Sequence, residues 1–197
     1  MATPPNTILL QAFEWNVPAD HKHFKRLLSH IEQLSDWGVN TLWIPPACKA
    51  ASPEGNGYDC YDLYDLGEFD QKGTTATKWG SKEELIALGR KAKDLNMGLY
   101  WDAVLNHKAG ADDKEKCKAQ EVDQNDRNKK VSEVYEINGW LKFDFDGRKD
   151  KYSKQRYHCE CACSTIAAKG WSLTVHYQGI ISPGRTTTQI TTRNPST

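Results

Sequence analysis

The chain has 197 residues, and its 26 basic and 26 acidic residues cancel. This length suits one ordinary domain with a hydrophobic core, but it falls short of the ~250 residues of a typical complete eight-stranded β/α barrel. A balanced charge creates no field that favours nucleic acid or an anionic membrane, so neither partner is expected. The apolar run at residues 8–10 is too short for a signal peptide or a membrane span, which predicts a cytoplasmic protein.

The first predicted elements are a strand, a helix and a second strand. Residues 7–13 form a short apolar run, and residues 39–44 form another that ends at Pro45. The helix between them is predicted to begin at an Asp20 N-cap and to stop at Gly38. Its buried face is predicted from apolar side chains at helical spacing: Phe24, Leu27, Leu28, Ile31 and Leu34.

A second helix and a third strand follow a Gly- and Asp-rich loop that runs to Gly80. Ser81 and Glu84 have the spacing of a capping box, and the predicted buried stripe of this helix is Leu85, Leu88, Ala92 and Leu95. The apolar run that ends at residue 105 predicts a buried strand over residues 98–105. Such alternation is typical of parallel βαβ units, and it fits either an open doubly wound sheet or the opening of a barrel.

The second half of the chain changes character twice. Residues 108–157 are charged and irregular, and Trp140, Phe143 and Phe145 alternate with polar residues, which predicts a β-rich excursion. An irregular insertion of this length is usually functional or disordered. Beyond His158 the charged residues are only Glu160, Lys169, Arg185 and Arg193, and threonines are clustered. This composition predicts a disordered or loosely attached tail.

The most informative motif is residues 102–107, Asp-Ala-Val-Leu-Asn-His, at the end of the predicted third strand. Functional residues of a β/α barrel lie where strands end and loops begin. A carboxylate, an amide and an imidazole in such a place can orient a sugar hydroxyl and a hard metal ion. Spacing alone leaves structural roles open for all of these residues. The Asp could be a helix-cap or turn residue, the Asn-His pair could form hydrogen bonds within its loop, and Tyr58 could be an ordinary packing residue.

Several ordered segments together resemble the α-amylases of glycoside hydrolase family 13, of the liquefying bacterial and intracellular fungal type. The matching segments are residues 10–15, 41–47, 57–69, 102–107 and 122–128. The resemblance covers about residues 7–157 and implies an α/β fold. The implied fold is an incomplete (β/α)8 TIM barrel of about three strands and two helices, followed by the start of a β-rich insertion domain B. The implied parts are residues 1–107, 108–157 and a non-homologous tail, 158–197.

The resemblance also implies a ligand and roles for four residues. The expected substrate is an α-1,4-glucan (starch, glycogen or a maltooligosaccharide), and the expected structural ion is calcium. By its position in the motif, Asn106 would be a calcium ligand, because amide oxygens suit this cation. His107 would hydrogen-bond the sugar, Asp102 would support the motif, and Tyr58 would stack on the same sugar. Further candidate oxygens for calcium are Asp112, Asp113, Asp123 and Asp126.

No catalytic residue is predicted in this chain. The family cleaves by the retaining route, which needs two carboxyl groups, and both follow the insertion domain. No Gly-x-Arg-x-Asp segment occurs after Tyr157, and Glu160 has the only carboxylic side chain there. We therefore expect a truncated and inactive α-amylase-like chain. The alternatives are a non-catalytic glucan-binding remnant and an inert truncated or misframed gene product. Since three strands cannot close a barrel, we expect poor autonomous stability.

The six cysteines predict no disulfide framework. Cys159, Cys161 and Cys163 are one residue apart, which is off the two-to-four spacing of paired zinc ligands. The remaining cysteines, Cys48, Cys60 and Cys117, are scattered and are interpreted as free thiols of a reducing compartment.

Overall fold

The structure, a computed structural model, describes residues 6–105, 107–126, 128–149 and 151–152, and the backbone of three strands at residues 165–168, 171–176 and 188–193. The chain divides into two compact units. The first contains Met1–Tyr58 and Asp62–Val104, and the second contains Asp59–Tyr61 and Leu105–Thr197.

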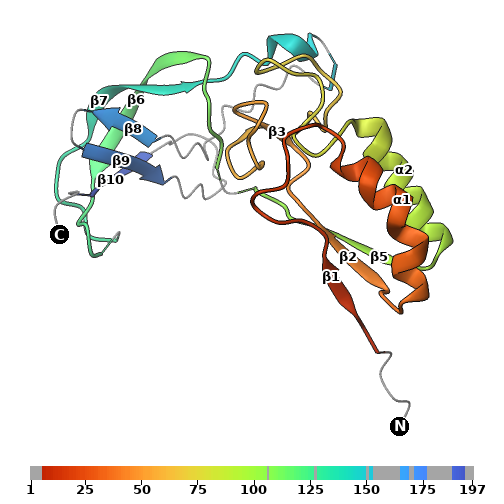
Figure 1. Cartoon of the computed structure of the whole chain (residues 1–197). Helices are drawn as coiled ribbons and strands as arrows, with labels where there is room; N and C mark the ends of the chain where they lie inside the picture. The colour runs from red at the N-terminus through yellow and green to blue at the C-terminus, as the bar shows by residue number, and fades with distance from the viewer. Residues whose placement is uncertain are drawn as a thin grey trace. The chain divides into compact units, whose positions relative to one another are not determined.

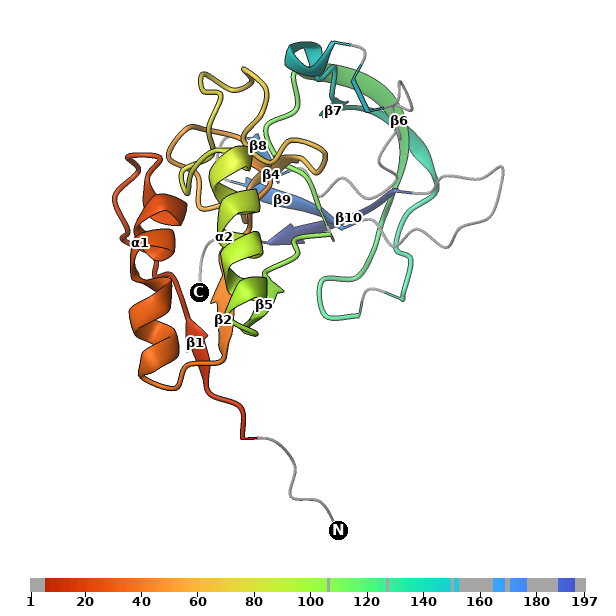
Figure 2. The same cartoon turned by 90° about the vertical axis from the view of Figure 1, so that its right-hand side faces the viewer.

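The first unit is a parallel sheet covered by two helices. The strands β1 (Leu9–Gln11), β2 (Thr41–Ile44) and β5 (Gly98–Trp101) are parallel, in the order β1-β2-β5. The helices α1 (His23–Asp36) and α2 (Lys82–Asp94) lie side by side against the sheet (Figure 1 and Figure 2). Their apolar side chains form the core with β2, namely Phe24, Ile31, Leu42, Ile44, Leu88 and Ala92. Over the described residues this sheet is open, and it does not close into a barrel.

Both predicted helices are confirmed, but the predicted N-cap of α1 is wrong. The cap residue is Lys22, which makes no side-chain cap hydrogen bond. Asp20 lies two residues earlier, where its carboxylate accepts from the Lys22 N–H at 3.2 Å and pairs with Arg26. The chain turns once more at His21, with φ of 58°, before the helix begins. The α1 end follows the prediction, because Gly38 has φ of 89°.

The capping box of α2 is confirmed. Ser81 Oγ accepts from the Glu84 N–H at 3.3 Å, and the Glu84 carboxylate accepts from the Ser81 N–H at 3.2 Å. The third strand exists but is shorter than predicted and is not buried. Tyr100 is 57% exposed and Trp101 is 43% exposed. The reason is that β5 is at the edge of the described sheet and has β2 as its only strand neighbour there.

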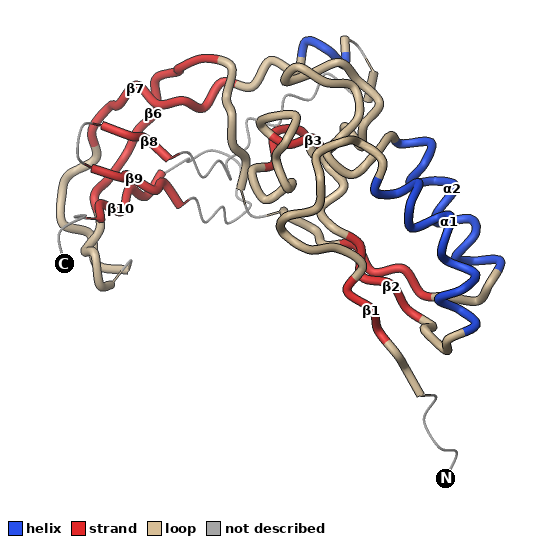
Figure 3. The backbone as a smooth tube through the Cα atoms, viewed as in Figure 1, coloured by secondary structure: helices blue, strands red, loops and turns tan. Residues whose placement is uncertain are grey.

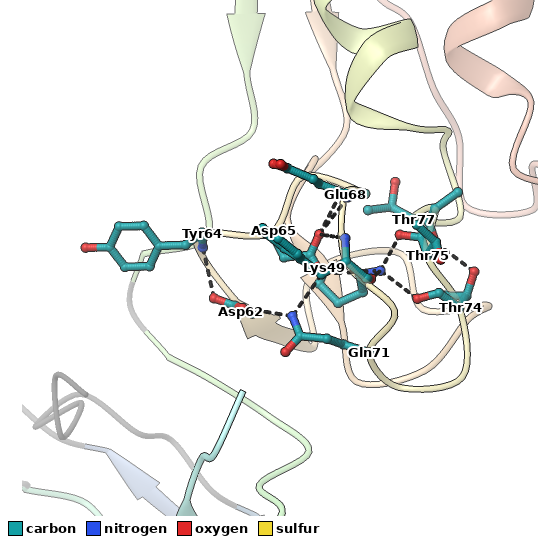
Figure 4. A network of polar contacts seen from close by, with 12 residues as sticks. Lys49, Asp62, Tyr64, Asp65, Glu68, Gln71, Thr74, Thr75 and Thr77 are labelled. Atoms are coloured by element: carbon teal, nitrogen blue, oxygen red, sulfur yellow. Dashed lines mark hydrogen bonds and ion pairs between the residues drawn. The ribbon is translucent and has the colours of Figure 1, made fainter. Parts of the chain in front are cut away.

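The long loop between β2 and α2 is folded around a buried charge. It includes β3 (Lys49–Ala50) and β4 (Cys60–Asp62), which form a two-stranded sheet. Lys49 Nζ lies 3.3 Å from the Asp65 carboxylate and donates to three carbonyl oxygens, those of Phe69, Thr74 and Thr75 (Figure 4). This network gives the loop a polar core of its own.

The second unit is β-rich, in agreement with the predicted excursion. The strands β6 (Asp113–Glu121) and β7 (Tyr135–Lys142) are antiparallel, with an irregularity between Asp113 and Lys114. They are followed by the short 3-10 helix η1 (Asp146–Arg148). The strands β8 (Thr165–Ala168), β9 (Trp171–His176) and β10 (Thr188–Arg193) extend the sheet in the order β7-β6-β10-β9-β8. Figure 3 shows the strands in red.

These three strands fall in the segment that was predicted to be a disordered tail. The other residues of 153–197, including Cys159, Cys161 and Cys163, lie outside the described residues. The division at residues 107 and 157 therefore stays a prediction. Neither of the two described α-helices has the length and apolar character needed to cross a membrane.

Candidate functional site

The carboxyl ends of the three parallel strands define one edge of the first unit. Two backbone hydrogen bonds extend the ladders beyond the strands, from Ala12 N to Trp43 O at 2.8 Å and from Asp102 N to Ile44 O at 3.1 Å. Because parallel strands end at the same edge, the segment after β1 and the segment after β5 both begin there. This edge is the candidate site, since ligands of such sheets bind outside the carboxyl ends of the strands.

Tyr58 and Asp102, which are 44 residues apart in the sequence, meet at this edge. The Tyr58 hydroxyl donates to Asp102 Oδ2 at 2.7 Å. Partial burial and this hydrogen bond to a carboxylate raise the pKa of Tyr58 to about 12. The phenol therefore stays protonated over the whole physiological pH range and donates a hydrogen bond that orients its ring. Two of the four predicted site residues are thus brought together.

Trp15 is a third member of the site that the sequence analysis did not single out. Its ring is stacked on that of Tyr58, with centroids 6.0 Å apart and an angle of 9° between the planes. Trp15 is 66% exposed and Tyr58 is 37% exposed. The available signal was its position in the matching segment at residues 10–15. We call these two side chains the Trp15–Tyr58 ring pair.

The Trp15–Tyr58 ring pair borders a pocket in the first unit. The pocket has a volume of about 280 Å³. Aromatic side chains and a few amide and carboxyl groups line it: Gln11, Phe13, Glu14, Trp15, Trp43, Asn56, Tyr58 and Trp79. Most drug-sized and sugar-sized ligands bind in concave sites with this mixture of apolar walls and few polar groups.

Of the other two predicted site residues, one belongs to the second unit and one lies outside the described residues. His107 is half-buried and belongs to the second unit, so its approach to Tyr58 and Asp102 stays a prediction. Asn106 lies outside the described residues. Its role as a metal ligand therefore stays a prediction as well.

The acidic residues of the second unit do not fit a calcium site by themselves. Among the residues that the structure describes, no three His, Cys, Asp or Glu side chains gather as metal ligands would. Their carboxylate oxygens are engaged locally instead. Asp112 accepts from the Tyr61 hydroxyl at 2.7 Å, Asp123 accepts from the Asn125 N–H at 2.9 Å, and Asp126 accepts from the Asn128 N–H at 3.0 Å. Calcium needs six to eight oxygen ligands around one point.

The assembled group offers both an apolar surface and hydrogen-bonding groups to a ligand. An exposed aromatic ring pair offers flat apolar area, and the adjacent carboxylate and phenol offer an acceptor and a donor. A retaining glycosidase needs two carboxyl groups about 5–5.5 Å apart, one on each side of the bond. At this edge Asp102 is hydrogen-bonded to Tyr58, and the Glu14 carboxylate accepts from the Asn16 N–H at 2.7 Å.

Known proteins match the first three quarters of the chain. Residues 14–155 match the family described as Alpha amylase, catalytic domain. The glucan 1,4-alpha-maltohexaosidase of Bacillus sp. (strain 707) is 45% identical over 152 residues, which are 77% of this chain and 29% of that protein. The alpha-amylase of Bacillus licheniformis is 45% identical over 153 residues, 78% of this chain and 30% of that protein.

A third relative carries a location in its name. The cytoplasmic alpha-amylase of Escherichia coli (strain K12) is 41% identical over 157 residues, which are 79% of this chain and 32% of that protein. The chain thus spans about a third of the length of the curated relatives it matches. With the family matched over most of its own length, the chain belongs to the α-amylases of glycoside hydrolase family 13.

Proposed function

We propose that this chain is the N-terminal part of an α-amylase-like glycoside hydrolase and that it binds α-1,4-glucan at the carboxyl edge of its parallel sheet. The stacked Trp15–Tyr58 ring pair beside Asp102 carries this proposal. In this proposal the three strands are the first of a (β/α)8 barrel, and residues from 108 onward begin the insertion domain B. The glucan is starch, glycogen or a maltooligosaccharide.

The chemistry of the ring pair supports a sugar ligand. The C–H faces of a pyranose ring are apolar and pack against an aromatic face, while the hydroxyls at its rim need hydrogen bonds. The Tyr58 hydroxyl is held by Asp102, so the ring is ordered before the sugar arrives. A carboxylate has about four lone-pair sites, so Asp102 can accept from a sugar hydroxyl in addition to Tyr58. His107 adds a further hydrogen bond to the same glucose unit.

A titration tests this binding directly. We expect the chain to bind maltoheptaose in titration calorimetry, and we expect Trp15→Ala or Tyr58→Ala to weaken the affinity by about tenfold or more, since stacking on an aromatic ring carries roughly 1–3 kcal/mol in comparable sites. Trp37→Ala is the matched control, because Trp37 is 68% exposed at the C-cap of α1, next to the opposite end of β2. Equal losses in all three variants would exclude the ring pair as the binding site, and a folded chain that binds no glucan would leave only the inert truncated or misframed product.

We also propose that the 197-residue chain does not hydrolyse glucan. The retaining mechanism requires a carboxylate pair, and Glu160 is the only carboxylic side chain after Tyr157. Loss of these groups removes the reaction itself, whereas loss of a binding residue lowers affinity. The check is a reducing-sugar assay with soluble starch. Turnover that disappears in Glu160→Gln would contradict the proposal.

Calcium affinity is proposed to be weak in this chain. Asn106 would supply one oxygen, and among the described residues no three His, Cys, Asp or Glu side chains gather as metal ligands would. Each missing oxygen ligand lowers both the charge and the coordination of the site. A titration with calcium chloride should show no micromolar binding, and micromolar binding that survives Asn106→Ala would exclude Asn106 as the ligand.

A cytoplasmic location is proposed on two supports. One relative is named a cytoplasmic alpha-amylase, and Cys48 and Cys117 are not in disulfide bonds, as in a reducing compartment. Fractionation of cells that express the chain tests the location, and recovery in the medium would contradict it.

A further inference from the structure

Lys78 is a buried cation that connects the two loops of the ring pair. Its side chain is 6% exposed. Its ammonium donates to the Trp15 carbonyl oxygen at 3.2 Å and to Asn56 Oδ1 at 2.5 Å, and it lies 5.0 Å from the centroid of the Trp79 ring. Trp15 belongs to the loop after β1, and Asn56 is two residues before Tyr58.

We propose that Lys78 is a positioning residue that holds the Trp15–Tyr58 ring pair in its stacked geometry. Its consequence for glucan affinity rests on the proposed function, but the positioning itself does not. Lys78 does not line the pocket, so it acts through the backbone of Trp15 and the side chain of Asn56.

The turn that carries Lys78 is rigid on both sides. Thr77 and Gly80 exchange backbone hydrogen bonds of 3.0 and 3.2 Å across it. Phe24 N, in the first turn of α1, donates to Trp79 O at 2.7 Å, and Gly80 leads directly into the capping box of α2. A Cβ on Gly80 would come within 2.9 Å of the Phe24 ring, so the turn is packed closely against α1. The backbone of Lys78 is therefore held in place by these hydrogen bonds and contacts.

The loops that Lys78 connects also meet through the ring stacking of Trp15 and Tyr58 and through Asn56. Asn56 Nδ2 lies 3.5 Å from the Trp15 carbonyl, at the limit of a hydrogen bond, and Asn56 O accepts from Trp79 Nε1 at 3.2 Å. The ammonium gives Trp15 and Asn56 one common donor. Trp15 is 66% exposed, so its ring is held through one stacked face, and the hydrogen bond from Lys78 to its carbonyl oxygen fixes the backbone from which the ring extends.

The partners of this cation explain how the fold accommodates its burial. Burial of an ammonium is costly unless its donors are satisfied. Two uncharged oxygens and an aromatic face satisfy Lys78, and hydrogen bonds from a charged donor are shorter and stronger than neutral ones. A methionine would keep the alkyl stem against Trp79 while removing both hydrogen bonds. An arginine would keep the charge and the donors.

The test uses the whole chain labelled with 5-fluorotryptophan, whose fluorine NMR spectrum reports each tryptophan separately. The Trp15 resonance is assigned with Trp15→Phe. We expect Lys78→Met to shift or broaden the Trp15 resonance and to leave that of Trp37 unchanged, and Lys78→Arg to restore it in part. Lys82→Met is the matched control, because Lys82 is half-buried in the next turn and pairs with Glu68, away from the ring pair.

Maltoheptaose affinity is measured on the same variants. We expect Lys78→Met to weaken it by about tenfold, on the order of one charged hydrogen bond, and Lys82→Met to leave it unchanged. An unchanged Trp15 resonance in folded Lys78→Met, or an equal change in Lys82→Met, overturns the positioning role. If the wild-type chain binds no glucan, the proposed function fails, while the fluorine spectra still decide whether Lys78 positions Trp15.

Discussion

Lys49 and Lys78 are two buried lysines of the same long loop, and the charge of their partners differs. Lys49 is 1% exposed and lies 3.3 Å from the fully buried carboxylate of Asp65, with carbonyl oxygens around its remaining donors (Figure 4). Lys78 has two uncharged oxygens and a ring. The first lysine compensates a buried charge and holds the loop together, whereas the second compensates no charge and connects neighbouring loops.

The Lys49 side of this comparison extends to a second carboxylate. Gln71 Nε2 donates to both Asp62 Oδ2 and Asp65 Oδ2, each at 2.9 Å (Figure 4). Burial lowers the pKa of Lys49, and the nearby carboxylates, first that of Asp65, oppose the decrease. Two carboxylates and one ammonium therefore share a buried site, so removal of the ammonium takes away the positive charge that compensates the carboxylates.

The largest expected effect is that of Lys49→Met on stability. Removal of one partner of a buried ion pair costs about 3–5 kcal/mol, because the Asp65 carboxylate remains buried without its cation. Urea unfolding measures the loss. Lys78→Met is the matched comparison, and its loss should be clearly smaller because no carboxylate depends on it. Equal losses of unfolding free energy in the two variants would show that the charge of the partner makes no difference to stability.

Gly57→Ala should come next, and it acts on the ring-pair side. Gly57 has φ of 92°, and a Cβ there would lie 2.6 Å from Pro46 Cβ and 2.7 Å from Pro46 O. The left-handed backbone and the clash together cost roughly 1–3 kcal/mol. Since Tyr58 is the next residue, glucan affinity should also decrease. Gly73→Ala is the control, because its φ is similarly positive, at 83°, but its Cβ would meet only Pro53 Cγ at 3.5 Å.

The elements of the first unit were largely predictable, because their signals are local. The capping box of Ser81 and Glu84 needs only a spacing of three residues, and it is found as predicted. The cap of α1 was not predictable in this way. Asp20 has the right residue type, but His21 adopts a positive φ and the helix begins where Phe24 N meets Trp79 O, 55 residues further along the chain.

The candidate site was predictable only where a family motif carried it. Tyr58 and Asp102 were singled out from matching segments, and the structure joins them by a hydrogen bond. Lys49 and Lys78 were missed, because a lysine in a Gly- and Asp-rich loop is normally solvated. Their burial depends on carbonyl and amide oxygens that lie 20 to 63 residues away in sequence, which periodicity does not encode.

A smaller loss of stability is expected for Ser81→Ala, which removes the N-cap of α2 next to the turn that contains Lys78. Loss of a side-chain cap costs about 1 kcal/mol, and the capping box follows Gly80 directly. The free energy of unfolding in urea checks the value. Asp20→Ala is the control at the start of α1, where no side chain caps the helix, so its loss should be smaller than that of Ser81→Ala. A larger loss of unfolding free energy in Asp20→Ala than in Ser81→Ala would show that Asp20 does cap α1.

The smallest effect concerns His23. The centroid of its ring lies 5.3 Å from that of Trp79, the residue after Lys78. His23 Nε2–H donates to the Ala12 carbonyl at 2.7 Å. Burial is the main cause that lowers the pKa of His23, and this hydrogen bond opposes the decrease. Of the nearby charges, Arg26 and Lys78 lower the pKa further and Asp20 raises it.

The sign of the resulting pH dependence follows from linkage. The folded pKa of His23 lies below the unfolded value of about 6.5, so between the two the unfolded chain binds more protons. This contribution to stability is complete above about pH 6.5 and is lost as the pH falls toward the folded pKa. The melting temperature should therefore fall between about pH 7.5 and about pH 5.5, and His23→Gln should reduce that fall. Lys78→Met removes one charge that lowers the pKa, so an NMR titration should give a slightly higher His23 pKa in that variant. An equal change in Lys49→Met would mean that the two buried lysines are not electrostatically separate.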